Sequence, residues 1–159
     1  MKHEKLTWKD VEKLVDILEQ KFMKEKKKYD FIIGINRGGL IPSVMLSHRL
    51  GSTHGVHTVH SYNGTEKRQL KADLYLSMVG FIHSHNTVLL VDDIADSGES
   101  IQASLTRIKK LDSDIKNIDV ATLHYKPKSI YIPQYYAKKI DNDIWIDYPW
   151  EQHKYLGTA

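Results

Sequence analysis

The 159-residue sequence contains no cysteine, which excludes disulfide bonds and catalysis by a thiolate. No apolar run approaches the roughly 18 residues that a membrane span requires, and no apolar signal-peptide core follows the charged residues Lys2 to Lys5. The formal net charge is only +3 and the lysines are scattered, so nucleic acid is not a favoured partner. We therefore expect a cytoplasmic protein without a membrane span.

The length suits one domain with a real core, and the apolar pattern alternates between strands and helices. The expected strands are 31–35, 56–62, 87–92 and 117–124, and the expected helices are 8–26, 40–50 and 101–111. Residues 63–73 are polar and predict a long loop, and residues 74–82 suggest a short strand pair or a hairpin arm. This order predicts an α/β fold with a Rossmann-like, twisted, mostly parallel sheet flanked by helices.

The last part of the chain, residues 125–159, differs from the rest. It is rich in tyrosine and tryptophan, contains three of the four prolines, and shows no helical periodicity. We expect one domain over 1–159, with a core of about residues 1–124 and a small C-terminal hood of about 125–155 over the strand ends. The alternative for most of these aromatic residues is that they shield a sheet edge.

The most informative segment is 88–100, which reads Val-Leu-Leu-Val-Asp-Asp-Ile-Ala-Asp-Ser-Gly-Glu-Ser. Four apolar residues form a buried strand, and two carboxylates follow at the edge of the sheet where ligands bind in open α/β folds. A short polar turn then opens a helix, whose free N–H groups suit a phosphate. Sugar hydroxyls, a phosphate and a divalent cation together describe a phosphorylated ribose. The alternative is a doubly wound fold in which the aspartates merely cap the helix.

This segment resembles the ribose-phosphate motif of the type I phosphoribosyltransferases. The resemblance implies that Asp92 and Asp93 hold the ribose hydroxyls, with Asp93 nearer a Mg²⁺ ion. It also implies that the 5′-phosphate binds to Asp96, Ser97, Gly98, Glu99 and Ser100. Ala95 departs from the family pattern, which usually has a larger aliphatic residue there.

Two further segments agree with this family. Arg37, Gly38 and Gly39 follow a strand and open a helix, where glycine lets the backbone approach an anion and arginine can bind two phosphate oxygens. They resemble the pyrophosphate loop, in which many members have a cis peptide that would fall at Asn36–Arg37. The polar segment 63–73 resembles the flexible catalytic loop, and its Arg68 would bind pyrophosphate during catalysis. The alternative for that segment is a solvated surface loop.

The sequence Trp145-Ile146-Asp147-Tyr148-Pro149-Trp150-Glu151, together with Lys126, narrows the resemblance to bacterial xanthine-guanine and related 6-oxopurine enzymes. An indole face can stack on a purine, and the donors of Lys126 suit a carbonyl at C6 rather than an amino group. Trp145 would supply that face, and main-chain carbonyls near Ile146 and Glu151 could accept from the base.

The resemblance implies a purine salvage enzyme that takes phosphoribosyl pyrophosphate, a purine base and Mg²⁺, as a homodimer or homotetramer. Asp96 is the predicted proton acceptor near N7 of the purine, and helix capping is its alternative role. The rival functions are a regulator that senses phosphoribosyl pyrophosphate or a nucleotide, and an enzyme that uses another base. The histidines, including His48, His54, His57, His60 and His124, have no metal-ligand spacing and are expected to be structural or surface residues.

Overall fold

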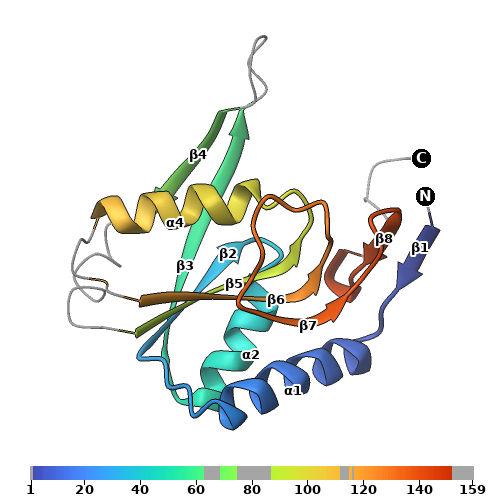
Figure 1. Cartoon of the computed structure of the whole chain (residues 1–159), viewed down its shortest axis with the longest axis horizontal. Coiled ribbons are helices and arrows are strands. Elements are labelled where there is room, and N and C mark those ends of the chain that lie inside the picture. Colours follow the sequence, from blue (N-terminus) through green and yellow to red (C-terminus); the bar gives the residue numbers. More distant parts are fainter. Residues whose placement is uncertain (1, 63–68, 75–86, 112–114, 116, 152–159) are drawn as a thin grey trace.

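A computed structural model describes residues 2–62, 69–74, 87–111, 115 and 117–151 (Figure 1). Its elements, in chain order, are β1 (Lys2–Lys5), α1 (Trp8–Lys24), β2 (Phe31–Asn36), α2 (Leu40–Leu50), β3 (Thr53–Tyr62), β4 (Gln69–Leu74), β5 (Thr87–Ala95), α4 (Glu99–Leu111), β6 (Asn117–Tyr125), β7 (Tyr135–Lys139), β8 (Ile144–Asp147) and the 3₁₀ turn η2 (Pro149–Glu151). Within these ranges, no helix combines the length and the apolar character needed to cross a membrane.

The described strands form a six-stranded sheet and a separate two-stranded sheet. The large sheet has the order β4-β3-β2-β5-β6-β7, in which all neighbours are parallel except the antiparallel pair β3 and β4. Helices α1 and α2 cover one face and α4 covers the other (Figure 1). The predicted α/β class and mostly parallel sheet are therefore confirmed.

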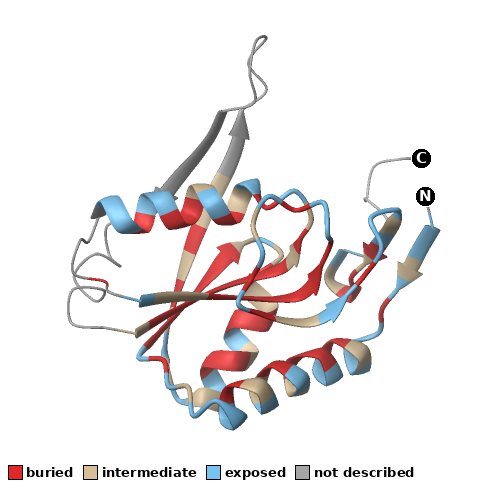
Figure 2. Ribbon diagram, in the orientation of Figure 1, coloured by how far each residue is buried: buried red, intermediate tan, exposed pale blue. Residues whose placement is uncertain are grey.

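The apolar pattern explains both layers of the core. Along β5, Leu89 and Val91 pack on the face of α1 and α2, whereas Val88 and Leu90 pack on the face of α4. All four side chains are buried because a central parallel strand has helices on both sides. Helix α1 buries a single stripe at helical spacing (Figure 2), and it begins at a capping box between Thr7 and Asp10.

The structure corrects two expectations about the chain outside the central strands. The polar segment 63–73 is not all loop, because residues 69–73 belong to β4 and pair with β3. The tail is also not only a hood, because β7 joins the main sheet beside β6. The predicted strand pair at 74–82 lies, beyond Leu74, outside the described residues.

The hood includes strand β1 from the N-terminal end of the chain in addition to the C-terminal segment. Strand β1 pairs in parallel with β8, which aligns Lys2 with Ile144 and Lys5 with Asp147 (Figure 1). The N–H of Leu6 continues this contact by donating to the carbonyl of Asp147 at 3.0 Å. The sequence pattern did not predict β1, since four exposed or half-exposed residues carry no apolar alternation.

Candidate active site

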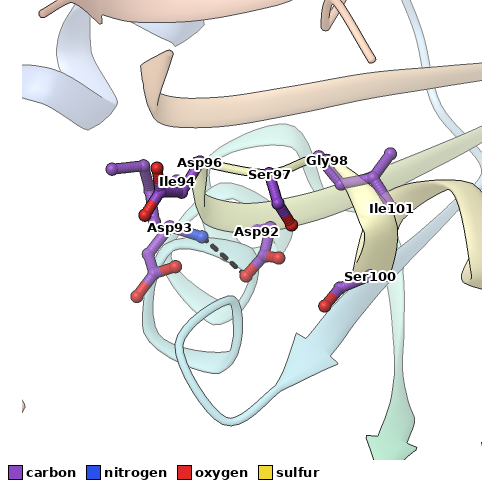
Figure 3. A pocket seen from close by; sticks show the side chains of 8 residues that line it. All are labelled: Asp92, Asp93, Ile94, Asp96, Ser97, Gly98, Ser100 and Ile101. Carbon is purple, nitrogen blue, oxygen red and sulfur yellow. Dashed lines mark hydrogen bonds between the residues drawn. The ribbon is translucent and has the colours of Figure 1, made fainter. Parts of the chain in front are cut away.

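A cavity of about 230 Å³ lies where β5 ends and α4 begins. Strand β5 is flanked in the sheet by β2 and β6, so the loops that follow these strands meet at the same edge. Figure 3 shows the lining side chains, which are Asp92, Asp93, Ile94, Asp96, Ser97, Gly98, Ser100 and Ile101. Six of the seven residues predicted to contact ribose and phosphate thus line one cavity. The seventh, Glu99, is the first residue of α4.

The two carboxylates at the end of β5 are nearly buried. Asp92 and Asp93 are 9% and 8% exposed, and the N–H of Asp93 donates to Oδ1 of Asp92 at 2.9 Å (Figure 3). Burial raises the pKa of both carboxyls, and the charge of Asp93 adds to the rise at Asp92. Such a pair is stabilised by groups that neutralise it, such as hydroxyl donors or a cation.

The turn at 96–100 is held in place by a segment from beyond β6. Gly98 has φ +82°, a conformation that favours glycine, and a Cβ there would lie 2.8 Å from the backbone nitrogen of Tyr131. The N–H of Ile130 donates to the carbonyl of Ser97 at 2.9 Å. The turn therefore presents the first N–H groups of α4 with little freedom to move, as an anion site requires.

The loop after β2 packs directly on the carboxylate pair. The peptide Asn36–Arg37 is cis, at the position that the resemblance predicted. A Cβ on Gly38 would overlap the carboxylate of Asp93, and one on Gly39 would lie 2.9 Å from Cα of Asp92. Arg37 itself is exposed. The structure therefore brings Arg37, Gly38 and Gly39 to the Asp pair, whereas Arg68 lies outside the described residues.

Asp96 faces two lysines. Its Oδ1 lies 3.3 Å from Nζ of Lys126 and 2.8 Å from Nζ of Lys128. Burial alone would raise the pKa of Asp96, but the two cations outweigh burial and leave the pKa below its ordinary value. The Lys126 side chain is 2% exposed, so its charge is deeply placed and paired with Asp96. Sequence reasoning did not identify Lys128.

Besides Lys126, which follows β6, the predicted base-binding residues lie on β8 and η2. The Trp145 side chain is 45% exposed, whereas Ile146 is 5% exposed and packs in the core. Glu151 is exposed at the end of η2. An exposed indole on a strand that is paired with β1 is a surface on which a flat ring can stack.

Tyr148 lies in the same segment and was not predicted as a site residue. Its hydroxyl donates to the carbonyl of Asp93 at 3.0 Å and lies 2.8 Å from Nδ1 of His124. Position 148 is 55 residues from Asp93, and nothing in the local sequence signals that contact.

Among the described histidines, some are buried in the fold and others, such as His48, are exposed on the surface. His57 and His124 are fully buried, and His54 Nε2 lies 2.9 Å from the hydroxyl of Ser43. Among the residues that the structure describes, no group of three or more His, Cys, Asp or Glu side chains is arranged to hold a metal ion.

Comparison with known proteins places this geometry in a family. The family model for the phosphoribosyl transferase domain matches residues 6–153. A purine phosphoribosyltransferase from Pyrococcus horikoshii is 34% identical, with a TM-score of 0.83 and 97% of each chain covered. A Neisseria gonorrhoeae protein whose crystal structure contains bound ppGpp is 28% identical, with a TM-score of 0.82 over 94% of this chain and 89% of that one.

Among curated proteins, a xanthine-guanine phosphoribosyltransferase from Cereibacter sphaeroides is 28% identical over 121 residues, which are 76% of this chain and 68% of the relative. The family model spans nearly the whole chain and includes the aspartate pair, the turn 96–100 and the hood strand β8. The chain therefore belongs to the phosphoribosyl transferase domain family.

Proposed function

We propose that this protein is a purine salvage phosphoribosyltransferase. It transfers the 5-phosphoribosyl group of phosphoribosyl pyrophosphate to N9 of guanine, xanthine or hypoxanthine and releases pyrophosphate. The observation that supports this most is the convergence at one sheet edge of the Asp92–Asp93 pair, the turn 96–100 and the loop 37–39. The similarity to purine and xanthine-guanine phosphoribosyltransferases supports the same reaction.

Each part of the substrate then has a place. Asp92 and Asp93 accept from the ribose 2′ and 3′ hydroxyls, and residues 96–100 bind the 5′-phosphate through the start of α4. Arg37, Gly38 and Gly39 bind pyrophosphate, together with Arg68, which directly precedes β4 in the sequence. Catalysis comes chiefly from holding the two substrates in line and from stabilising positive charge at C1′ as pyrophosphate leaves.

The donor set fits a hard divalent cation that arrives with its substrate. Two buried carboxylates with raised pKa values favour a neutralising cation, and Mg²⁺ usually binds through one or two carboxylates together with substrate oxygens. Asp93 is the carboxylate that would contact it. When bound, Mg²⁺ offsets the negative charge of the pyrophosphate and ribose oxygens.

The base lies between the hood and the phosphate turn. Trp145 stacks on the purine, main-chain carbonyls near Ile146 and Glu151 accept from its N–H groups, and Lys126 donates to the carbonyl at C6. Lys126 is paired with Asp96 in this structure. Sharing its protons with the purine carbonyl weakens that pairing and makes Asp96 a better proton acceptor near N7.

Pyrophosphate release tests the proposal. The full chain is mixed with phosphoribosyl pyrophosphate, Mg²⁺ and one base from a panel of guanine, xanthine, hypoxanthine and adenine. We expect release with the three 6-oxopurines and little with adenine. Asp93→Asn should lose activity, and Asp143→Asn, which changes an exposed carboxylate between β7 and β8, should keep it. Absence of release with every base would contradict the proposal.

A second candidate is a nucleotide-sensing protein that keeps the fold without turnover. The observation in its favour is the bound ppGpp in the related Neisseria protein. Calorimetry with ppGpp and the pyrophosphate assay together separate the two functions. A sensor binds ppGpp in calorimetry and releases no pyrophosphate in the assay above. We also expect a cytoplasmic homodimer or homotetramer, and light scattering on the purified chain tests the oligomeric state.

A further inference from the structure

Tyr148 stands in the middle of the segment that is proposed to bind the base. It follows β8, which carries Trp145 and Ile146, and it precedes η2, which carries Glu151. The N–H of Glu151 donates to the carbonyl of Tyr148 at 3.0 Å, so the position of η2 depends on that of Tyr148. The residue after it is proline, which further restricts its backbone.

The side chain of Tyr148 reaches out of the hood to the main chain of Asp93, next to the carboxylate pair proposed to bind ribose. It is 2% exposed, and its hydroxyl donates to the Asp93 carbonyl at 3.0 Å. The backbone of Asp93 is thereby held on both sides of its Cα, since its N–H donates to the Asp92 carboxylate. A buried carbonyl that lost this donor would lose a hydrogen bond that water cannot easily replace.

The Asp93 carbonyl and His124 on β6 together determine the direction of the two hydrogen bonds of the Tyr148 hydroxyl. A carbonyl can only accept, so the single proton of the Tyr148 hydroxyl goes to Asp93, and Nδ1 of His124 carries the proton that the phenol oxygen accepts at 2.8 Å. Burial lowers the pKa of His124 to about 4 and raises that of Tyr148, which keeps the ring neutral and the phenol protonated. Tyr148 also stacks on Trp150, with the two ring centres 4.6 Å apart.

We propose that Tyr148 is a positioning residue that sets the distance between the bound purine and the bound ribose. It joins the base-binding segment to the main chain of Asp93 through one buried hydrogen bond, and His124 orients that bond. The proposal rests on the proposed function, because it concerns how N9 of the base meets C1′ of the sugar. Bond formation needs both atoms within about 3–3.5 Å, so an error of about 1 Å in their relative placement costs about 100-fold in rate.

Tyr148→Phe removes the hydroxyl and leaves unchanged the groups of the two half-sites, which are the base-binding segment and the ribose-phosphate site. We expect kcat to fall about 10- to 100-fold, while KM for phosphoribosyl pyrophosphate changes less than about threefold. Binding of GMP, which occupies both half-sites at once, should weaken about tenfold, while binding of phosphoribosyl pyrophosphate with Mg²⁺ stays within about threefold. The split between these two ligands is the result that a merely structural role would not produce.

Tyr29→Phe is the matched control. Tyr29 is also nearly buried, and its hydroxyl donates to Asp119 at 2.7 Å from the segment before β2, at the opposite end of the strand from the Arg37 loop. This variant loses a hydrogen bond of similar length that is partly buried, so it should lower the melting temperature and leave kcat and both ligand affinities unchanged. Equal weakening of GMP and phosphoribosyl pyrophosphate in Tyr148→Phe, or no change in either, would overturn the proposal.

A second pair of variants tests the same link without changing Tyr148. His124→Asn retains a side-chain N–H donor near the position of Nδ1, whereas His124→Leu does not. We expect the leucine variant to lose at least threefold more kcat than the asparagine variant, and equal kcat values would overturn the proposal. The wild-type pyrophosphate assay alone decides the proposed function, and GMP binding by wild type and variants decides the part played by Tyr148.

Discussion

The substitution Gly39→Ala tests how closely the loop after β2 must pack on β5. A Cβ at position 39 would lie 2.8 Å from the Ile35 carbonyl oxygen and 2.9 Å from Cα of Asp92, and closer still to the carbonyl oxygen of Val91. All three are backbone atoms of core strands, so none can move aside as a flexible side chain would. An ordinary carbon–oxygen contact needs about 3.3 Å, and the loop would have to shift by about 1 Å.

Two consequences of that shift can be given magnitudes. Overpacking of this kind costs about 1–3 kcal/mol of folding stability, which corresponds to a fall in melting temperature of about 2–12 °C for a chain of this size. The same displacement moves Arg37 and Gly38 away from the Asp93 carboxylate, against which Gly38 packs. We expect kcat/KM for phosphoribosyl pyrophosphate to fall about 100-fold, because catalysis depends on placement within about 1 Å.

The assay compares Gly39→Ala with Gly51→Ala by thermal melting and by steady-state release of pyrophosphate. Gly51 ends α2 with φ +65°, and a Cβ on it would have no neighbouring atom within 4 Å. Alanine there costs about 1–2 kcal/mol through backbone strain alone and should leave the kinetic constants unchanged. If Gly39→Ala kept wild-type kcat/KM, or if both variants lost activity equally, the reasoning from backbone contact would be wrong.

Three further outcomes are expected. Asp96→Asn should lower kcat at least about 100-fold while KM for phosphoribosyl pyrophosphate changes little, and equal losses in both would count against Asp96 as the proton acceptor. Lys126→Met, which keeps the volume of a buried side chain, should reduce the preference for guanine over adenine in a competition assay, and an unchanged preference would remove its role at C6. The third concerns His124, whose pKa is lowered from 6.5 to about 4 by burial and by Lys138, with Glu4 opposing. Between pH 6.5 and 4 the unfolded chain binds more protons at this position than the folded chain, so stability falls as the pH is lowered through that window, by about 3 kcal/mol. Urea unfolding of wild type and His124→Asn should show their stability difference shrinking by about that amount from pH 7 to pH 4, and a constant difference would show that His124 does not titrate in this way.

Much of the central sheet could be predicted from the chain because its signals are local. The run Val88–Val91 is short and has no polar interruption, which favours a strand that is buried on both faces. Helix α1 was predicted because its apolar stripe repeats at helical spacing within a few turns. The aspartate pair and the turn 96–100 are contiguous in sequence, and they line one cavity for that reason.

The peripheral strands could not be predicted from local patterns, because each is defined by pairing with another strand. Strand β7 carries no alternation that marks it as a sheet strand, and it is placed by pairing with β6. Strand β1 exists only against β8, which lies about 140 residues later in the chain. The boundary of β4 was missed because polar composition predicts a loop, whereas backbone pairing with β3 is indifferent to side-chain polarity.

By itself, the sequence determined the α/β class, the strand that carries the aspartate pair, and the family resemblance. These follow from apolar periodicity and from short motifs, which act over a few residues. Only the tertiary structure decided that Lys128 joins Lys126 at Asp96, that Gly39 packs against the backbone of β5, and that Tyr148 bonds to the carbonyl of Asp93. Those contacts depend on where separate strands end at one edge of the sheet. Short sequence patterns do not encode the spatial separation of residues that are distant in the chain.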